Sequence, residues 1–307
     1  MIMDKNSQYF KQAQLLVRIL PCITRHDCFA LKGGTAINLF VRNLPRLSVD
    51  IDLVYVPVAD RNSSLSHIDR ELRMIINELK KQIPDMAVIA PLSQGSNLVF
   101  KIVAQHQDAH VKVEVSSVGR GVVFDVVLKN ICAKAQEEFG FASINMVSFE
   151  DLYAGKICAA LDRQHPRDLF DVKILFENEG ISNDLLKAFL VYLISCNRPI
   201  AELLSPRFSD LNQKYITDFT GMSFVKISLE ELKRTRELLV TRIHSMLTDD
   251  DKKFLMSFKY GNPDWGLLGL NGVSKLPAVR WKMYNLNQMS MSRRKTAIEK
   301  LEKILYQ

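Results

Sequence analysis

The stretch "ALKGGTAINLFVRNLPRLSVDIDLVYVP", residues 30–57, decides the fold of the first half of the chain. Its apolar start ends at two adjacent glycines, Gly33 and Gly34, and its second part, "LSVDIDLVYV", alternates apolar and polar residues, which predicts a strand. Successive side chains of a strand point to opposite faces, so Asp50 and Asp52 share one face, with their Cα atoms about 7 Å apart. A strand with two carboxylates so close together points to a bound cation.

Neighbouring carboxylates raise each other's proton affinity unless a cation lies between them, and magnesium prefers carboxylate and phosphate oxygens. A second alternating stretch, "HVKVEVSSV", predicts a strand with Lys112 and Glu114 opposite its valines. If the two strands are neighbours, Glu114 joins Asp50 and Asp52, and three acids can hold two metal ions about 3.5–4 Å apart. The alternative is that each acid belongs to the polar side of a half-exposed strand.

The double glycine fits the same interpretation. Glycine lets the backbone approach a ligand closely, and the helix predicted from Thr35 to about Arg42 would direct its N-terminal amides toward that ligand. Thr35 can cap this helix or bind a phosphate oxygen.

The rest of the first half predicts an α+β fold, with a mixed or antiparallel sheet flanked by helices. A short strand, "CFALKG", precedes the double glycine, and two strands form a hairpin around Gln107 and Asp108. Helices are expected at about 7–20 and 64–82.

After residue 148 the pattern becomes mostly helical. Helical spacing occurs near 149–163, 167–178, 182–196, 228–247 and 292–305, whereas 197–227 and 257–280 are expected to be connecting loops. The predicted domains are 1–148, an α/β domain, and 149–307, a helical domain with a basic C-terminal segment.

The first helix of the second half carries an apolar stripe at positions 154, 157, 158 and 161, which leaves Lys156 and Arg163 together on the other face. Two cations placed in this way can bind the phosphates of a nucleotide. Asp168 and Asp171 lie one turn apart in the next helix. The alternative is that these acids neutralise nearby arginines in a structural ion network.

Composition narrows the functional classes. The formal net charge is +7, and residues 151–307 hold 24 basic against 19 acidic side chains. Residues 275–307 alone hold 8 against 2, which would attract a polyanion such as nucleic acid, unless they form an ordinary solvated helix face. No P-loop, nucleophile elbow or zinc-ligand spacing is present. With no signal peptide and no apolar span in the sequence, we expect a soluble, cytoplasmic protein without membrane contact.

Gly33-Gly34-Thr35 followed by Ser48-x-Asp50-x-Asp52 resembles the signature of the DNA-polymerase-β-like nucleotidyltransferase superfamily. More specifically, the chain resembles the AbiEii/AbiGii toxin family, which includes the MenT toxins. A second part of the resemblance is the series Lys156, Arg163, Arg167, Asp168 and Asp171, and a third, less specific part is "LPAVRWKMYNL", residues 276–286.

The resemblance implies a magnesium-dependent nucleotidyltransferase that moves NMP from an NTP to an acceptor hydroxyl and releases pyrophosphate. It implies metal binding by Asp50, Asp52 and Glu114, and further catalytic roles for Lys156 and Asp168. The nucleotide would be bound by Gly33, Gly34, Thr35, Ser48, Lys156 and Arg163.

In this family the acceptor is typically the 3′ end of tRNA, and the partner is an antitoxin encoded alongside. Phosphorylation of Ser48 would be a point of control. Two alternatives remain open: a nucleotide- or RNA-binding protein with a vestigial site, and transfer to a protein hydroxyl.

Overall fold

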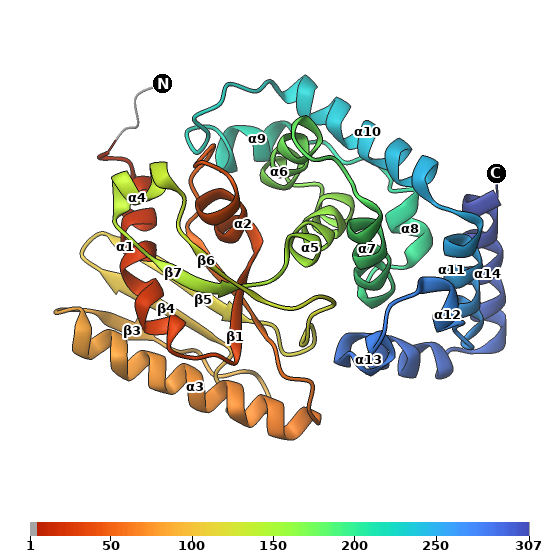
Figure 1. Ribbon diagram of the computed structural model, residues 1–307, viewed down its shortest axis with the longest axis horizontal. Helices are drawn as coiled ribbons and strands as arrows, with labels where there is room; N and C mark the ends of the chain where they lie inside the picture. The colour runs from red at the N-terminus through yellow and green to blue at the C-terminus, as the bar shows by residue number, and fades with distance from the viewer. Residues whose placement is uncertain (1–4, 307) are drawn as a thin grey trace. The chain divides into compact units, whose positions relative to one another are not determined.

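The computed structural model describes residues 5–306 and divides the chain into two compact units (Figure 1). The first comprises Met1–Ser148 with Gly221–Lys226, and the second comprises Phe149–Thr220 with Ile227–Gln307. Among the described residues, no helix combines the length and apolarity needed to cross a bilayer.

The first unit is an α+β structure built on one seven-stranded sheet, in the order β3-β4-β5-β2-β1-β7-β6. Its pairing is mixed: β2 runs parallel to β5, β1 runs parallel to β7, and the other neighbours are antiparallel. The predicted fold class is confirmed. The strands are β1 (Phe29–Lys32), β2 (Asp50–Tyr55), β3 (Ala87–Ile89), β4 (Lys101–His106), β5 (Ala109–Val115), β6 (Val127–Asn130) and β7 (Ser143–Met146).

Two long helices, α1 (Gln8–Thr24) and α3 (Arg61–Gln82), pack against the sheet and against each other. Each begins at a side-chain cap, Ser7 for α1 and Asp60 for α3. Helix α1 continues through Pro21 rather than ending at residue 20. The final turn is stabilised by burial of Cys22 and Ile23, which compensates for the hydrogen bond that proline cannot donate.

The alternation predicted for β2 and β5 determines which residues join the core. Ile51, Leu53 and Val113 are fully buried, whereas Asp50 and Asp52 are half-buried on the opposite face of the sheet. The predicted hairpin is confirmed as β4–β5, with Gln107 at a positive φ of 51° in its turn. Strands β3, β6 and β7 were not predicted, because three or four residues are too few to establish a period of two.

The helix after the double glycine is shorter and less regular than predicted. Helix α2 (Gly33–Ala36) passes directly into a π-helical turn, η1 (Ile37–Val41). The segment 221–226 lies beside the entry to β2, since Leu47 N donates to Met222 O at 2.8 Å and Phe224 N donates to Pro45 O at 2.9 Å. Helix α4 (Ala133–Phe139) completes the helices of this unit among the described residues.

The second unit is helical throughout its described part. The predicted helices are confirmed as α5 (Phe149–Asp162), α6 (Pro166–Glu177), α7 (Asn183–Ser195), α10 (Leu229–Met246) and α14 (Met291–Tyr306). The expectation of loops at 197–227 and 257–280 is wrong in part, because helices occupy much of them. These are α8 (Ile200–Leu204), α9 (Asn212–Asp218), α12 (Trp265–Leu268) and α13 (Pro277–Asn287), with a 3₁₀ turn, η2 (Val273–Lys275). Helix α11 (Asp249–Tyr260) was not predicted, and only its end reaches into the second of these stretches.

Candidate active site

The double glycine packs directly against the strand that carries the two aspartates. Gly33 has a φ of +75°, and a Cβ atom placed on it would lie 2.6 Å from Asp52 Oδ2. At Gly34 an added Cβ would lie 2.8 Å from Arg46 Nη2 and 3.1 Å from Ser48 Oγ. Only glycine therefore leaves room for the Asp52 carboxylate beside the end of β1.

Thr35 and Ser48 fix the start of β2. The Thr35 hydroxyl is hydrogen-bonded to the Asp50 carbonyl oxygen at 2.5 Å and to the Ser48 hydroxyl at 2.9 Å. Both side chains are buried. These contacts hold the backbone of Asp50 in place, and the predicted roles of Thr35 and Ser48 in nucleotide binding remain predictions.

The structure brings together acids from two chain segments that are about sixty residues apart in sequence. Strands β2 and β5 are parallel neighbours, with Asp52 opposite Glu114 and Asp50 opposite Lys112. Paired residues of adjacent strands project from the same face, so the three predicted metal ligands lie on one face of the sheet.

Cations flank the two acids on either side. Lys32 of β1 is the register partner of Asp52, and Lys101 of β4 is the register partner of Glu114. The four residues therefore form a row across four strands, Lys32–Asp52–Glu114–Lys101, which we call the acid row. Its two central carboxylates lie between two ammonium groups, an arrangement suited to a ligand that carries both phosphates and a divalent cation.

Lys112 forms an ion pair with one of the acids. Its Nζ lies 3.2 Å from Glu114 Oε2. Partial burial opposes its charge, but attraction to Asp50 and the contact with Glu114 outweigh burial and raise the pKa of Lys112. The ammonium group thus offsets part of the repulsion between the carboxylates.

Only oxygen donors come from the three acids, which matches the preference of a hard divalent cation such as Mg²⁺. Among the described residues, however, the acids do not form a group whose donor atoms all lie within 4.8 Å of one another. The Glu114 carboxylate is instead paired with Lys112. The chemistry of the donor set fits the metal, and Glu114 is the ligand that would have to exchange its partner.

Sequence reasoning missed Arg46, which is buried beside Gly34. Its guanidinium donates to the Leu47 carbonyl oxygen at 2.9 Å. A signal was available, because Arg46, Ser48, Asp50 and Asp52 occur at every second position. It also missed Lys32 and Lys101, whose relation to the acids depends on strand order.

The predicted phosphate-binding cations of the second unit lie in a buried ion cluster. Lys156 of α5 is only 6% exposed, and its Nζ lies 2.8 Å from Asp168 Oδ1 and 2.9 Å from Asp171 Oδ2. Arg163 Nε donates to Asp168 Oδ2 at 2.6 Å, while 63% of the Arg163 side chain stays exposed. Helical spacing placed Lys156 and Arg163 together on the face opposite the apolar stripe; the structure joins both to Asp168, but of the two only Arg163 is exposed.

The buried charges of this cluster are balanced. Burial alone would raise the pKa of the Asp168 carboxyl, but Lys156 and Arg163 outweigh it and hold that pKa well below its usual range. Asp168 is therefore ionised at neutral pH. The cluster ties α5 to α6, as the structural alternative proposed, and the catalytic roles predicted for Lys156 and Asp168 remain predictions.

A second group of potential metal donors lies in the first unit. Donor atoms of Cys28, His67 and Glu71 lie within 4.8 Å of one another. Glu71 is already hydrogen-bonded to His26 Nδ1 at 2.7 Å and to His67 Nε2 at 3.1 Å. Burial, followed by the charge of Glu71, raises the pKa of the Cys28 thiol to about 12. Both carboxylate oxygens of Glu71 therefore already have hydrogen-bond partners within this group.

A mixed sheet with a double-glycine turn beside two alternating aspartates is the core of a nucleotidyltransferase. The family model of the AbiEii nucleotidyl transferase toxins, which belong to type IV toxin–antitoxin systems, matches residues 14–285. This chain therefore belongs to the AbiEii toxin family, as the sequence motifs suggested.

The fold comparison agrees with the family. The structure is similar to MenT4, a nucleotidyltransferase toxin from Mycobacterium tuberculosis H37Rv, with a TM-score of 0.59 and 11% sequence identity. The match covers 97% of this chain and 93% of MenT4. At this identity the likeness concerns the fold alone. Comparison with curated protein sequences gave no match.

Proposed function

We propose that this toxin transfers a nucleoside monophosphate from an NTP to a hydroxyl group at the 3′ end of RNA, with tRNA as the acceptor. The observation that carries the proposal is the acid row, in which Asp52 and Glu114 are register partners on adjacent strands and Asp50 lies on the same face. A purely structural sheet surface has no need for three carboxylates beside a glycine turn that admits nothing larger.

In this reaction the acceptor hydroxyl oxygen forms a bond to the α-phosphorus. The bond from that phosphorus to the oxygen bridging to the β-phosphate breaks, and pyrophosphate leaves with the electron pair. Glu114 has a half-exposed side chain, and we assign it the hydroxyl proton in addition to metal binding. Lys112 would stabilise Glu114 when its carboxylate carries the negative charge.

Asp50, Asp52 and Glu114 would hold Mg²⁺, two ions in the arrangement that three acids allow. When bound, the metal would neutralise phosphate charge, activate the attacking oxygen and stabilise the negative charge on the leaving oxygen. The chain's own contribution is the fixed position of the ligands: Gly33 leaves space for Asp52, and Thr35 holds the backbone of Asp50.

Gly33, Gly34, Thr35 and Ser48 would bind the nucleotide through the glycine turn and the start of α2. Buried Arg46 beside Gly34 adds positive charge at this turn. An anionic phosphate is favoured where exposed backbone amides and a guanidinium are close together.

In the second unit, Lys156 and Arg163 would act on nucleotide phosphates, with Asp168 holding both cations in place. Arg163 is the exposed member and the one that a ligand can reach directly. The NTP affinities of Lys156→Met and Arg163→Met variants test this role. We expect Arg163→Met to bind NTP more weakly. Lys156→Met should bind NTP more weakly only if Lys156 exchanges its carboxylate partners for the phosphates.

The proposed partners are an NTP, RNA and a cognate antitoxin, and the proposed location is the cytoplasm. Membership of a toxin family of type IV toxin–antitoxin systems supports the antitoxin. The basic excess of residues 151–307 supports RNA, because cationic side chains bind the phosphate backbone largely without reading sequence.

The proposal is tested by incubating the protein with each α-³²P-labelled NTP, Mg²⁺ and total RNA. We expect label on RNA 3′ ends, loss of transfer in Asp52→Asn, and normal transfer in Asp108→Asn, which removes an exposed carboxylate in the β4–β5 turn. Label on protein instead would favour a protein acceptor. RNA binding without transfer, indifferent to Asp52→Asn, would favour a vestigial site.

A further inference from the structure

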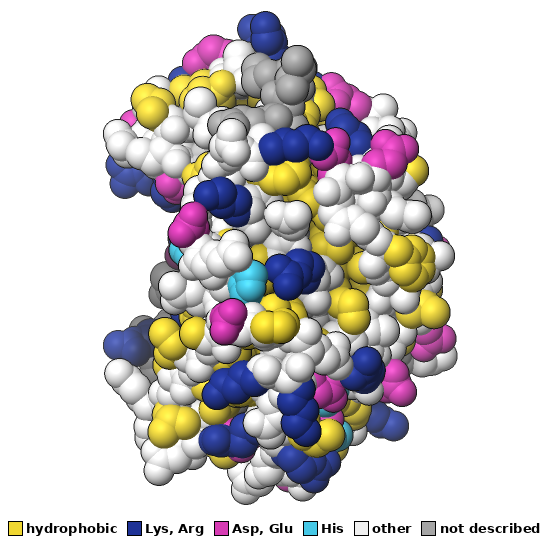
Figure 2. Space-filling model, turned by 90° about the vertical axis from the view of Figure 1, so that its left-hand side faces the viewer, with side chains coloured by type: hydrophobic (Ala, Val, Ile, Leu, Met, Phe, Trp, Pro, Cys, Tyr) yellow, Lys and Arg dark blue, Asp and Glu magenta, His cyan; other side chains and the backbone are white. Residues whose placement is uncertain are grey.

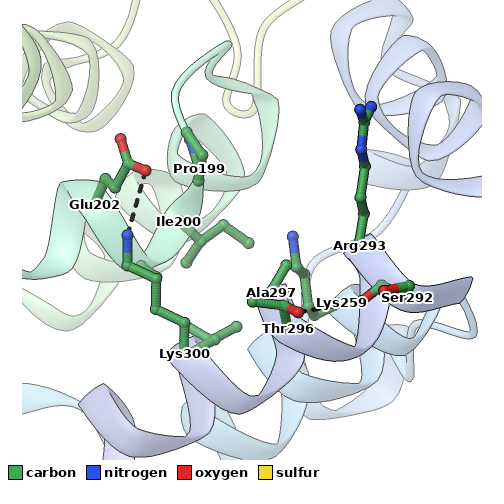
Figure 3. A pocket seen from close by; sticks show the side chains of 11 residues that line it. Pro199, Ile200, Glu202, Lys259, Ser292, Arg293, Thr296, Ala297 and Lys300 are labelled. Atoms are coloured by element: carbon green, nitrogen blue, oxygen red, sulfur yellow. Dashed lines mark hydrogen bonds and ion pairs between the residues drawn. The ribbon is translucent and has the colours of Figure 1, made fainter. Parts of the chain in front are cut away.

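A cavity of about 310 Å³ lies within the helical unit, between α8, α11 and α14 (Figure 3). Its walls combine apolar residues of α8 with cationic and hydroxyl side chains of the other two helices. The lining includes Ile200, Lys259, Ser292, Arg293, Thr296 and Lys300. A second cavity of about 230 Å³ shares Lys259 and adds Lys282 from α13.

Lys259 is the unusual member of this lining. It is 7% exposed, yet its ammonium group has no ion pair or hydrogen bond with any other residue in the range 5–306. In Figure 3 its side chain reaches from α11 toward the cavity. Burial, with the charges of Lys282 and Arg294, lowers the pKa of Lys259. An ammonium group without a counter-ion, on a side chain that is mostly buried, favours the binding of an anion.

The surroundings provide positive charge without a free acid to balance it. Among the eleven residues that line the cavity, Glu202 is the one carboxylate, and it is already paired with Lys300 at 3.3 Å. Arg293 projects from α14 beside the cavity in Figure 3. Nearby, Nε and Nη2 of Arg294 are buried with no hydrogen-bond partner among the described residues.

We propose that this cavity binds a phosphate group, with Lys259 as its central ligand and Arg293 and the Ser292 hydroxyl as further donors. A phosphate brings several acceptor oxygens and up to two negative charges, which suits more than one cation and hydroxyl at the same point. The inference concerns the helical unit alone and holds whether or not the acid row catalyses nucleotidyl transfer.

The cavity also has room for part of the group that carries the phosphate. Its volume is at the lower end of small-ligand pockets, and its apolar walls at Pro199, Ile200 and Ala297 suit a ring or a sugar edge. A mononucleotide and the backbone of single-stranded RNA both present this chemistry, so the test must separate them.

The experiment measures binding of inorganic phosphate, AMP and a short single-stranded RNA to the full-length protein by calorimetry, in low-salt buffer without other anions that bind. The test variant is Lys259→Met, which keeps the packed stem and removes the charge. Its matched control is Lys253→Met, which removes an exposed lysine from the same helix. Arg293→Gln and Lys295→Gln form a second pair on α14.

We expect Lys259→Met to weaken phosphate binding by about tenfold or more, and Lys253→Met to change it by less than about twofold. Without ligand, Lys259→Met should melt at the same or a higher temperature than the parent protein, because a buried unpaired charge is gone. A combination of lost binding and retained stability separates a ligand site from a structural lysine.

Competition between phosphate, AMP and RNA then identifies which kind of molecule supplies the phosphate group. Displacement of phosphate by RNA but not by AMP assigns the site to an RNA backbone, and displacement by AMP assigns it to a nucleotide; both support the site. If Lys259→Met and Lys253→Met lose phosphate affinity equally, the loss reflects only the lower net charge of the protein, and the proposal is overturned. Undetectable phosphate binding to the parent protein, or unchanged binding in Lys259→Met, would overturn it as well.

Discussion

Gly33 shows how one residue can leave space for a carboxylate that lies on another strand, that of Asp52. Two restraints act on it: a φ of +75°, which disfavours any other L-residue, and an added Cβ only 2.6 Å from Asp52 Oδ2. Gly95 has the same kind of backbone, with a φ of +80°, but nothing lies within 4 Å of its added Cβ. Comparing alanine variants at the two glycines therefore separates the effect of backbone strain from the effect of displacing the Asp52 carboxylate.

We predict that Gly33→Ala abolishes transfer or reduces its rate at least about a hundredfold, because displacing a reactive group by about 1 Å lowers a reaction rate by that much. Gly95→Ala should cost roughly 1 kcal/mol of stability through strain and leave transfer unchanged. Thermal melting and label transfer, measured on both variants, check this. Equal activity losses in the two variants would contradict the assigned role of Gly33.

The alternating residues were the part of the site that sequence could predict. Period-two spacing and the adjacent glycines are local features, and they were sufficient to propose Asp50 and Asp52 together. The same spacing related Lys112 to Glu114. Lys32 and Lys101 could be related to the acids only through the register of β1 with β2 and of β4 with β5. That register is a long-range property that a single sequence does not contain.

Among the elements, α5 and α6 depend on their buried ion cluster. Asp168 is 1% exposed and contacts both Lys156 and Arg163. Because its pKa is lowered in the folded protein, Asp168 contributes stability above its unfolded pKa of 3.8, and this contribution is lost as the pH falls below that value. Removing one partner of a buried pair also leaves the other charges uncompensated.

We predict that Asp168→Asn lowers the free energy of unfolding of the helical unit by about 3 kcal/mol at neutral pH. The deficit should stay constant from about pH 7 to pH 5 and narrow below about pH 4. Both tryptophans, Trp265 and Trp281, belong to this unit, so urea unfolding followed by their fluorescence reports on it.

The control is Asp250→Asn, which removes an exposed carboxylate paired with Lys253 at 3.6 Å. It should change stability by less than about 1 kcal/mol at any of these pH values. A deficit for Asp168→Asn that grows as the pH falls would reverse the expected sign and refute the assignment of a lowered pKa.

The missed helices have identifiable reasons. Helix α11 begins with a capping box in which Thr248 and Asp251 bond each other's backbone amides, followed by acidic residues in the first turn. This signal was readable, but residues 248–256 were assigned neither to a helix nor to a loop, and only the end of α11, residues 257–260, lies in the expected loop. Helices α8 and α12 have five and four residues, too few for helical periodicity to register.

At the scale of the whole molecule, net charge is the main property relevant to a nucleic-acid partner. The chain carries a formal charge of +7, of which the first 150 residues contribute little, with 17 basic against 15 acidic side chains. Figure 2 shows one face of the molecule, on which Lys and Arg side chains gather toward the lower end and lie among Asp and Glu elsewhere. The excess of positive charge lies in the second half of the sequence.

We predict that RNA binding is strongly salt-dependent, because cations that contact phosphates release counter-ions. Affinity for tRNA should fall at least about tenfold between about 50 and 200 mM salt. Fluorescence anisotropy with labelled tRNA measures it, and Asp52→Asn should show the same salt slope as the parent protein, since the acid is not a phosphate-binding cation. A salt-independent affinity would contradict binding through the basic excess.

The proposed reaction requires that acids from β2 and β5 share bound divalent cations. Mn²⁺ is a paramagnetic substitute for Mg²⁺, and electron paramagnetic resonance counts the bound ions in the presence of a non-hydrolysable NTP. We predict that Asp52→Asn and Glu114→Gln each bind fewer Mn²⁺ ions than the parent protein, whereas Asp108→Asn binds as many. Undiminished Mn²⁺ binding in Asp52→Asn and Glu114→Gln would contradict it.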